Sequence, residues 1–296
     1  MESLTMNKIF DKIKSGNKTG YLMSMPYVVY FSVFVAFPLA FSFFLIFHKW
    51  NIITPMEWVG LRNFDRLFHD MQFLKSIRNT LVFLAIHIPL QISVALFFAI
   101  QLNKKIKFRG FFRALFFLPV IVSGVVITIL WEQLYSYETG LLNLILTRFG
   151  FARIPWINSP EWAMPSIAIM ATWKNVGLYI ILFLVGLQGI PGYLYEAAEI
   201  DGAKPYQRFF HITVPALNNT MMLVVILSTI GGFSLFIEPF VMTGGGPMSS
   251  TLSAMLYIYN QAFYFGHMGY AATMGFFFAF IILIVILIQK KVVERD

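Results

Sequence analysis

Long apolar stretches separated by polar segments dominate the pattern of this chain. They cover residues 21–47, 80–101, 111–131, 163–190, 216–241 and 269–289. Each is long enough for a helix to cross a bilayer, which takes about 20 apolar residues, and none shows the alternation of a barrel strand. The pattern predicts an all-α fold, a polytopic membrane bundle with six transmembrane helices.

The polar ends of the chain are short. Residues 1–20 form a polar tail with four lysines, residues 21–289 form the membrane domain, and residues 290–296 form a second tail. We expect the first apolar stretch to stay in the mature protein, because it is too long for a signal-peptide core and no small-residue cleavage site follows the tail.

Composition supports a membrane protein and excludes several other classes. Hydrophobic residues make up 58% of the chain and charged residues 12%, which leaves too little polar surface for a water-soluble globule. The net charge of +8 comes from Lys and Arg beside the apolar stretches, where lipid headgroups rather than nucleic acid would meet them. Without cysteine, thiol catalysis and Cys-ligated metals are excluded. We predict no cofactor and no metal site.

The distribution of basic residues predicts the orientation. Six spans put both termini on one face, and that face carries 14 Lys and Arg residues against 7 on the other. Basic loops stay inside, so both termini and the 191–215 segment are predicted to face the cytoplasm of a bacterial cell membrane.

The polar segment 191–215 has a local pattern of its own. After Pro191-Gly192, apolar residues near helical spacing predict a short amphipathic helix at the membrane surface. Gly202 permits a sharp bend, and Pro205 suits the first turn of a second helix. A protruding helix, bend and helix would fit a groove on a soluble partner.

This segment resembles the EAA loop of the permease subunits of ABC importers. The pattern of Glu-Ala-Ala, Gly four residues later, then Ile and Pro is present, and only Val214 stands where the family has Leu. The resemblance implies that the loop couples the permease to cytoplasmic ATPase subunits. The implied coupling residues are Glu196, Ala197, Ala198, Asp201, Gly202 and Pro215.

Two further segments are similar to external loops of carbohydrate importers, on the side of the first permease of maltose-type systems. They are residues 58–64, followed by Asn79-Thr80, and residues 242–263. The resemblance implies the type I importer architecture, a second permease in a heterodimer, two ATP-binding subunits and an extracellular sugar-binding protein. The turn Gly244–Pro247 is not a phosphate loop, since no Gly-Lys-Ser/Thr follows, and ATP would be used by the partners alone.

Polar and aromatic residues inside the fourth and fifth spans are the candidates for a substrate path. Sugars bind to hydrogen-bonding groups beside aromatic rings. The candidates are Trp173, Asn175, Tyr179, Phe233, Ser234 and Glu238. For each of them helix packing is an equal alternative. Lys174 should face protein, water or a partner rather than lipid. In the second span, His87, Pro89 and Gln91 favour a kinked packing helix over a ligand site.

These features predict a transport subunit and no enzyme, because the chain carries none of the common catalytic motifs. The predicted function is translocation of a sugar or oligosaccharide delivered by the binding protein. The alternative is an ion-coupled secondary transporter of a small polar solute. That class usually has repeated halves, none of which is evident here, and it would leave the EAA pattern unexplained.

Overall fold

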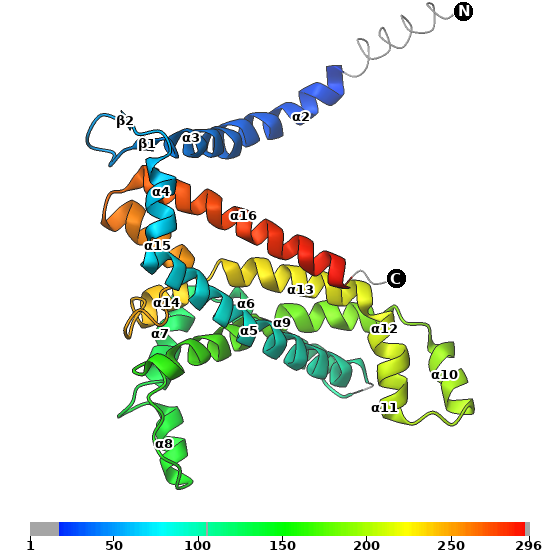
Figure 1. Cartoon of the computed structure of the whole chain (residues 1–296). Helices are drawn as coiled ribbons and strands as arrows, with labels where there is room; N and C mark the ends of the chain where they lie inside the picture. Colours follow the sequence, from blue (N-terminus) through cyan, green and yellow to red (C-terminus); the bar gives the residue numbers. More distant parts are fainter. Residues whose placement is uncertain (1–17, 105, 294–296) are drawn as a thin grey trace, which may run out of the picture.

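The computed structural model describes residues 18–104 and 106–293, whose regular structure is almost entirely helical (Figure 1). Most of the predicted N-terminal tail, the lysine at position 105 and the last three residues lie outside the described residues. The membrane domain is slightly longer than predicted. Residues 18–20 already belong to the first helix and residues 290–293 to the last.

Among the described residues, five helices are long and apolar enough to cross a membrane, and a bent pair forms a sixth span. In chain order the spans are α2 (Lys18–Phe31) with the π-helical η1 (Ser32–Ala36) and α3 (Phe37–Leu45), α5 (Met71–Asn103), α6 (Arg109–Ile121) with α7 (Gly124–Leu134), α9 (Pro160–Gln188), α13 (Asn218–Phe233) with α14 (Ile237–Met242), and α16 (Met268–Val293). The six predicted spans are therefore present.

Shorter elements connect the spans. They are the antiparallel strands β1 (His48–Lys49) and β2 (Glu57–Trp58), and the helical segments α4 (Arg62–His69), α8 (Leu141–Arg148), α10 (Gly192–Ile200), α11 (Pro205–Arg208), η2 (Phe209–Thr213), α12 (Val214–Ala216), α15 (Ala254–Tyr259) and η3 (Asn260–Tyr264). We call the end that carries α10 and α11 the loop face, and the end that carries β1, β2 and α8 the hairpin face (Figure 1).

The third span departs from the single helix that its apolar run predicts. Helices α6 and α7 meet at 98°, and Val122 between them is extended. Pro119 contributes to the break, because it donates no hydrogen bond and its ring crowds the preceding turn. Non-helical backbone at membrane depth is tolerated where protein or a cavity covers it. Here the start of α7 adjoins Lys174, since a side chain at Gly124 would come within 2.9 Å of its Nζ.

Helix α9 forms the centre of the bundle and packs against α5, α6 and α13. Of its most apolar stretch, 61% is buried, more than in any other described span. Gly177 explains one close contact, because a Cβ there would lie 2.1 Å from the Phe116 carbonyl oxygen. Small residues allow helix backbones to approach in a membrane, where packing replaces the hydrophobic driving force.

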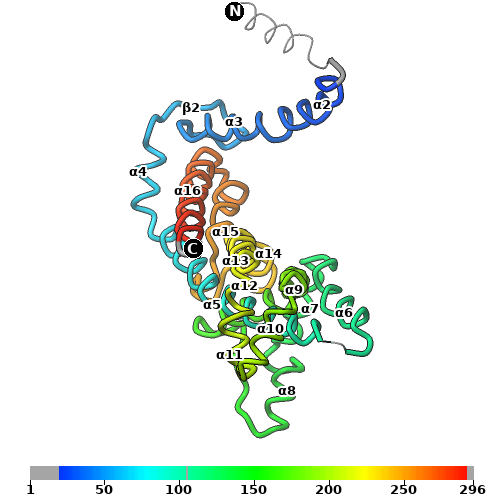
Figure 2. Tube along the Cα trace, turned by 90° about the vertical axis from the view of Figure 1, so that its right-hand side faces the viewer, coloured from blue at the N-terminus to red at the C-terminus, as the bar shows by residue number. Residues whose placement is uncertain are grey.

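The first span stands away from the bundle. In both views α2 and the beginning of α3 run apart from the other helices and join them only near the hairpin face (Figures 1 and 2). Only 6% of its apolar stretch is buried. The α2 part of the span is thus exposed, while α3 packs against α16 near the hairpin face.

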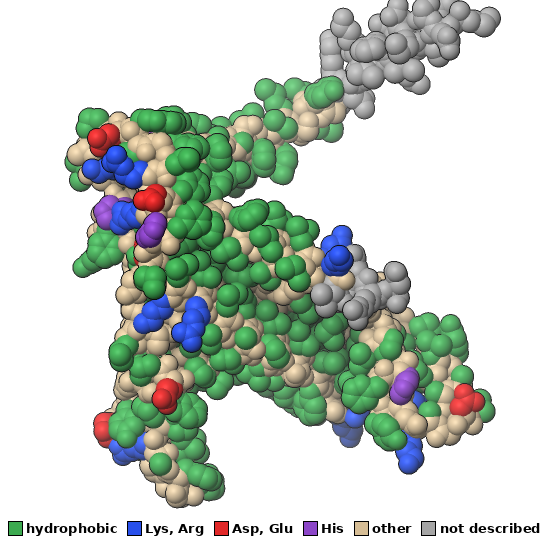
Figure 3. All heavy atoms as spheres, viewed as in Figure 1, with side chains coloured by type: hydrophobic (Ala, Val, Ile, Leu, Met, Phe, Trp, Pro, Cys, Tyr) green, Lys and Arg blue, Asp and Glu red, His purple; other side chains and the backbone are tan. Residues whose placement is uncertain are grey.

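Charged side chains gather at the two ends of the molecule. On the side seen in Figure 3, hydrophobic side chains cover the middle, while Lys, Arg, Asp, Glu and His lie at the loop face and the hairpin face. This distribution is typical of a helical bundle whose middle meets lipid and whose ends meet water.

Asp70 joins several elements at the hairpin face. One carboxylate oxygen caps α5 by accepting the Gln72 and Phe73 amides at 3.0 Å. The other accepts the Tyr257 hydroxyl at 2.9 Å and the Tyr270 hydroxyl at 2.6 Å. Burial opposes ionisation, but these hydrogen bonds outweigh it and lower the pKa of the carboxyl. One side chain thereby connects α5 with α15 and α16.

We predict that Asp70→Ala lowers the free energy of unfolding by about 1–3 kcal/mol, because two hydroxyls and two helix amides lose their acceptor. Thermal unfolding of the wild type and the variant in nanodiscs measures this loss of stability. Asp65→Ala, which removes only an exposed contact to His69, is the control and should have little effect.

Asp70→Asn keeps the helix cap, since Asn also caps helices well, but removes the charge and the oxygen that accepts the two tyrosine hydroxyls. A lowered pKa means that ionised Asp70 stabilises fully above about pH 4 and that this contribution is lost as the pH falls through the folded pKa. Asp70→Asn should therefore reduce the acid sensitivity of unfolding. An unchanged pH profile would contradict this role.

Candidate functional site

The segment 191–215 folds as helix, bend and helix. Helix α10 ends in a Schellman motif, in which the Ala203 amide donates to the Ala198 carbonyl at 2.8 Å and the Gly202 amide to the Glu199 carbonyl at 3.1 Å. Gly202 has φ +74°, a conformation that suits glycine. Pro205 then lies in the first turn of α11. The predicted local structure is confirmed.

Side chains brace the two helices of the loop against each other. Arg208 Nη1 donates to Glu199 Oε2 at 3.2 Å, and the Tyr195 and Thr213 hydroxyls are 2.9 Å apart. Behind the loop, a cavity of about 310 Å³ separates it from the ends of α5 and α9. The two helices of the loop are therefore joined by side-chain contacts, and the loop stands out from the spans.

Most residues of the EAA pattern are accessible. Glu196, Ala197, Asp201, Gly202 and Pro215 are exposed, and Ala198 is half-buried. Ile200, the last residue of α10 before the bend, is 88% exposed. Tyr193, Tyr206 and Phe210 are exposed as well. The surface of the loop thus combines acidic and large apolar side chains, as protein interfaces do.

A cavity of about 250 Å³ lies among the spans, lined by residues of α5, α9, α13 and α14. Four of the predicted substrate-path residues line it together: Asn175, Tyr179, Ser234 and Glu238. The helix is interrupted at residues 234–236, between α13 and α14, beside this cavity. The structure therefore brings these candidates to one polar cavity inside the membrane domain.

The other two candidates lie elsewhere. Trp173 is 45% exposed, and its ring centre lies 5.4 Å from that of Trp131. Phe233 is buried and packs edge-on against Phe278. Both turn away from the cavity because residues adjacent in a helix point in directions about 100° apart.

An ion pair crosses one wall of the cavity. Lys174 Nζ donates to Glu238 Oε1 at 3.0 Å, and the two side chains are 15% and 10% exposed. This explains how the chain tolerates a lysine at membrane depth. The sequence showed both residues, but nothing in a separation of 64 positions indicated that they pair.

Two further polar residues, His87 and Ser228, line the cavity. His87 lines it and has Nδ1 2.9 Å from the Thr172 hydroxyl. Ser228 lines it and donates to Gln91 Oε1 at 3.1 Å. The sequence favoured packing for His87 and Gln91, and the structure shows the packing contacts. It also places His87 beside the candidate path.

The turn 243–251 at the hairpin face is held by the second span. Lys75 Nζ donates to the Met248 carbonyl at 2.7 Å, and Asn79 Nδ2 donates to the Ser249 and Leu252 carbonyls. Thr80 accepts the Ala254 amide at 3.0 Å. The two similar segments noted in the sequence, around Asn79-Thr80 and in 242–263, therefore contact each other.

Fold and loop together define a membrane permease with a protruding segment of helix, bend and helix. Residues 15–295 match the family "Binding-protein-dependent transport system inner membrane component", and the chain belongs to this family. The assignment decides between the two transporter classes that the sequence left open, in favour of a binding-protein-dependent system.

Individual relatives agree over nearly the whole chain. It is 37% identical to the probable ABC transporter permease protein YurN of Bacillus subtilis, covering 92% of this chain and 94% of that protein. It is 36% identical to the trehalose/maltose transport system permease protein MalF of Thermococcus litoralis, covering 86% of this chain and 87% of that protein. A crystallised bacterial ABC transporter that imports alginate shares the fold, with a TM-score of 0.82, 24% identity and coverage of 97% and 99%.

We predict that Lys174→Met and Glu238→Leu each destabilise the bundle by about 3 kcal/mol, because each leaves one charge uncompensated among buried groups. The double variant should recover most of this loss, since both charges are then gone. Thermal unfolding in nanodiscs of the wild type, the two single variants and the double variant gives the coupling free energy between the two side chains. Additive losses would show that the two side chains do not act as a pair.

Proposed function

We propose that this chain is one permease subunit of an ATP-driven ABC importer, and that it translocates a sugar or oligosaccharide delivered by an extracellular binding protein. The observation that carries the proposal is the rigid EAA loop, a stiff unit with exposed acidic and apolar side chains at one end of a membrane bundle. The family assignment and the sugar-transport names of relatives support it.

The loop is proposed to dock in a groove of a cytoplasmic ATPase subunit. Glu196, Ala197 and Ala198 lie in the second half of α10, and the small side chains at 197 and 198 allow close approach of a partner. The Gly202 bend and the Glu199–Arg208 ion pair hold α10 to α11, and α11 leads through η2 and α12 into α13. A displacement of α10 by the partner would therefore also displace α13. The nucleotide chemistry takes place in the partner.

A second permease is proposed to cover the first span. A helix of 26 residues with 6% of its apolar stretch buried gains little from its own bundle. Packing against a neighbouring permease would bury one side of α2 and α3. This supports a pair of permeases, which we take to be a heterodimer, with the translocation path between or beside them.

The membrane cavity is proposed as part of the sugar path. Asn175, Ser234 and His87 offer hydrogen-bonding groups, and Tyr179 adds an aromatic ring with a hydroxyl. The ion pair makes the cavity wall polar without a net charge. That combination suits the hydroxyls and C–H faces of a sugar.

The orientation follows from the same assignment. If the EAA loop meets a cytoplasmic ATPase, the loop face is inside and the hairpin face outside, as the excess of basic residues also predicts. We propose a multi-pass protein of the bacterial cell membrane with both termini in the cytoplasm.

Gly202→Val should uncouple ATP hydrolysis from uptake. Valine is strained at φ +74° by about 1–2 kcal/mol, although no atom lies within 4 Å of the added Cβ, so the bend rather than the packing is disturbed. Gly202→Asn is the matched control, since Asn tolerates this conformation. Uptake and ATPase activity are measured with the reconstituted transporter. Equal, fully coupled uptake by both variants would reject the role of the bend.

Removing a hydrogen-bonding group from the cavity should slow uptake. We expect Tyr179→Phe and Asn175→Ala each to reduce the rate about 5–30-fold at a fixed concentration of loaded binding protein, the effect of one lost hydrogen bond to substrate. Trp173→Phe, outside the cavity, should change it by about twofold or less. If Trp173→Phe is the more damaging variant, the path lies elsewhere.

A further inference from the structure

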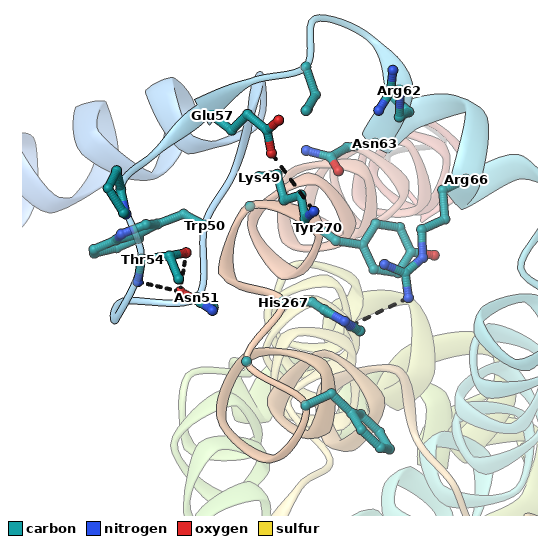
Figure 4. A pocket seen from close by; sticks show the side chains of 15 residues that line it. Lys49, Trp50, Asn51, Thr54, Glu57, Arg62, Asn63, Arg66, His267 and Tyr270 are labelled. Atoms are coloured by element: carbon teal, nitrogen blue, oxygen red, sulfur yellow. Dashed lines mark hydrogen bonds and ion pairs between the residues drawn. The ribbon is translucent and has the colours of Figure 1, made fainter.

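The hairpin face carries two protrusions that differ in chemistry (Figure 1). One is the loop between β1 and β2 together with α4, where charged side chains border a cavity of about 390 Å³ (Figure 4). They are Lys49, Glu57, Arg62 and Arg66. Charged groups need water, so this protrusion marks where the spans leave the bilayer. The other protrusion is formed by residues 136–158, which contain α8 and which we call the α8 lobe.

A buried asparagine closes the α8 lobe. Asn143 Nδ2 donates to the Tyr137 carbonyl at 3.2 Å and to the Ile154 carbonyl at 3.0 Å. Asn143 Oδ1 accepts the Ile154 amide at 3.0 Å and Trp156 Nε1 at 3.1 Å. One residue of α8 makes all four hydrogen bonds, so it joins the two ends of the lobe and fixes its shape.

The lobe is also fixed to the bundle. The hydroxyl of Tyr135, directly after α7, donates to the Ser166 carbonyl of α9 at 2.9 Å, and the Ser166 hydroxyl donates to the Trp156 carbonyl at 2.9 Å. The ring centres of Tyr135 and Trp156 lie 5.4 Å apart. The surface of α8 is therefore held at a set position relative to α7 and α9.

Helix α8 turns its apolar stripe outward. Leu141, Leu144 and Ile145 are spaced i, i+3 and i+4, so they share one face of the helix, while Asn143 points into the lobe. The three apolar side chains are 44% to 54% exposed. A helix surrounded by water has polar residues on such a face. The stripe thus indicates an apolar environment on the side of α8 away from its own chain.

The turn after α8 adds two exposed phenylalanines. Gly150 has φ +80°, and the Phe151 amide donates to the Leu146 carbonyl at 2.9 Å, which completes a Schellman motif. Phe149 and Phe151 flank this glycine and are 75% and 65% exposed. Because the turn is regular and hydrogen-bonded, the two rings are exposed by an ordered backbone.

The figures place the lobe beside the bundle. In Figure 1, α8 runs across the direction of the spans, at the level of their ends. In Figure 2, seen from the loop face, α8 extends beyond the outline of the spans. On the side seen in Figure 3, charged side chains lie on the outer left edge of the lobe and hydrophobic ones on the edge toward the apolar middle of the molecule. The lobe therefore borders the layer that lipid occupies beside the bundle.

Polar groups of the lobe suit a membrane surface. Arg148 ends α8 at i+7 from Leu141, and among the described residues it has no hydrogen-bond or ion-pair partner for its side chain. A long arginine side chain can reach headgroup phosphates from an apolar face. Tyr137, and Trp162 with its ring centre 6.0 Å from that of Trp156, are partly exposed. Such rings are enriched where a bilayer meets water.

We propose that the α8 lobe is an anchor in the membrane surface. Its apolar stripe and the two phenylalanines enter the boundary between headgroups and acyl chains, in the leaflet at the hairpin face, and Arg148 contacts lipid phosphates. Through Tyr135 the leaflet then holds the end of the bent third span. The anchor requires only that the chain spans a membrane, and it is independent of what the protein transports.

A second permease is the other occupant that this apolar face could receive. The exposed α2 and α3, which are assigned to such a subunit above, lie on the opposite side of the bundle from α8 in both views (Figures 1 and 2). A subunit packed there leaves the lobe uncovered, which favours lipid.

Spin labels measure the depth of the lobe, because the chain has no cysteine and an introduced thiol is the one labelled site of this subunit. Leu144→Cys, Phe149→Cys and Thr139→Cys are each purified with their accompanying subunits and placed in nanodiscs, and the wild type treated with the same reagent gives the background. Power saturation compares access by oxygen, which dissolves in lipid, with access by a water-soluble nickel chelate. We expect the labels at 144 and 149 to lie about 5–10 Å below the headgroup level. Thr139, beside Glu138 in the turn before α8, is the control, and its label should lie in water.

Two results would overturn the anchor. In one, nickel reaches the labels at 144 and 149 as readily as the label at 139, so that the face lies in water. In the other, neither oxygen nor nickel reaches them, which would assign the face to a protein partner.

Amide hydrogen exchange gives a second measure that needs no label. Leu144→Asn/Phe149→Asn should raise the exchange rate of residues 141–151 in nanodiscs about tenfold or more, because two apolar side chains no longer hold the lobe in lipid. Ile53→Asn is the matched control, since this isoleucine of the other protrusion is 90% exposed. It should change exchange of residues 50–57 by about twofold or less. Equal exchange of residues 141–151 in the wild type and the double variant would contradict the anchor.

Discussion

The absence of water inside a bilayer is the constraint on which this structure depends. Every backbone amide and every charge at membrane depth must find its partner within protein, which leaves helices as the economical solution. The exceptions to regular helix are therefore informative. The break between α6 and α7 and the break before α14 lie where Gly124, Lys174 and Glu238 approach one another, at the edge of the cavity.

Helices α9 and α13 connect the cavity with the EAA loop at the end of the molecule. Helix α9 carries Lys174 and Asn175 at its middle and leads directly into the EAA loop, while α13 returns from that loop to the cavity. A stiff loop that moves with a partner would therefore displace both walls of the cavity at once. Packed helices transmit such displacements because their interiors are dense and resist compression.

Much of this could be predicted from the sequence, for a physical reason. Apolar runs near 20 residues indicate membrane spans directly, and the bend at Gly202 follows from local chemistry, so the spans, the loop and its bend were predicted. Contacts between distant residues were not. The Lys174–Glu238 pair, the Asp70 contacts and the separation of Trp173 and Phe233 from the cavity depend on helix rotation and on the break at Val122, which an apolar run does not show.

The central claim is that residues 196–202 contact an ATP-hydrolysing subunit, and a single-cysteine experiment tests it most directly. The chain contains no cysteine, so a cysteine placed at Ala197 is the one thiol of this subunit. With the complex in native membranes, a thiol-to-amine crosslinker should join this position to an ATPase subunit identified by mass spectrometry, with a yield that changes when ATP is added. A cysteine at Ile53, on the opposite face, should give no such product. If the Ala197 position crosslinks only to lipid or to the chain itself, in membranes where the protein is folded, the account is contradicted.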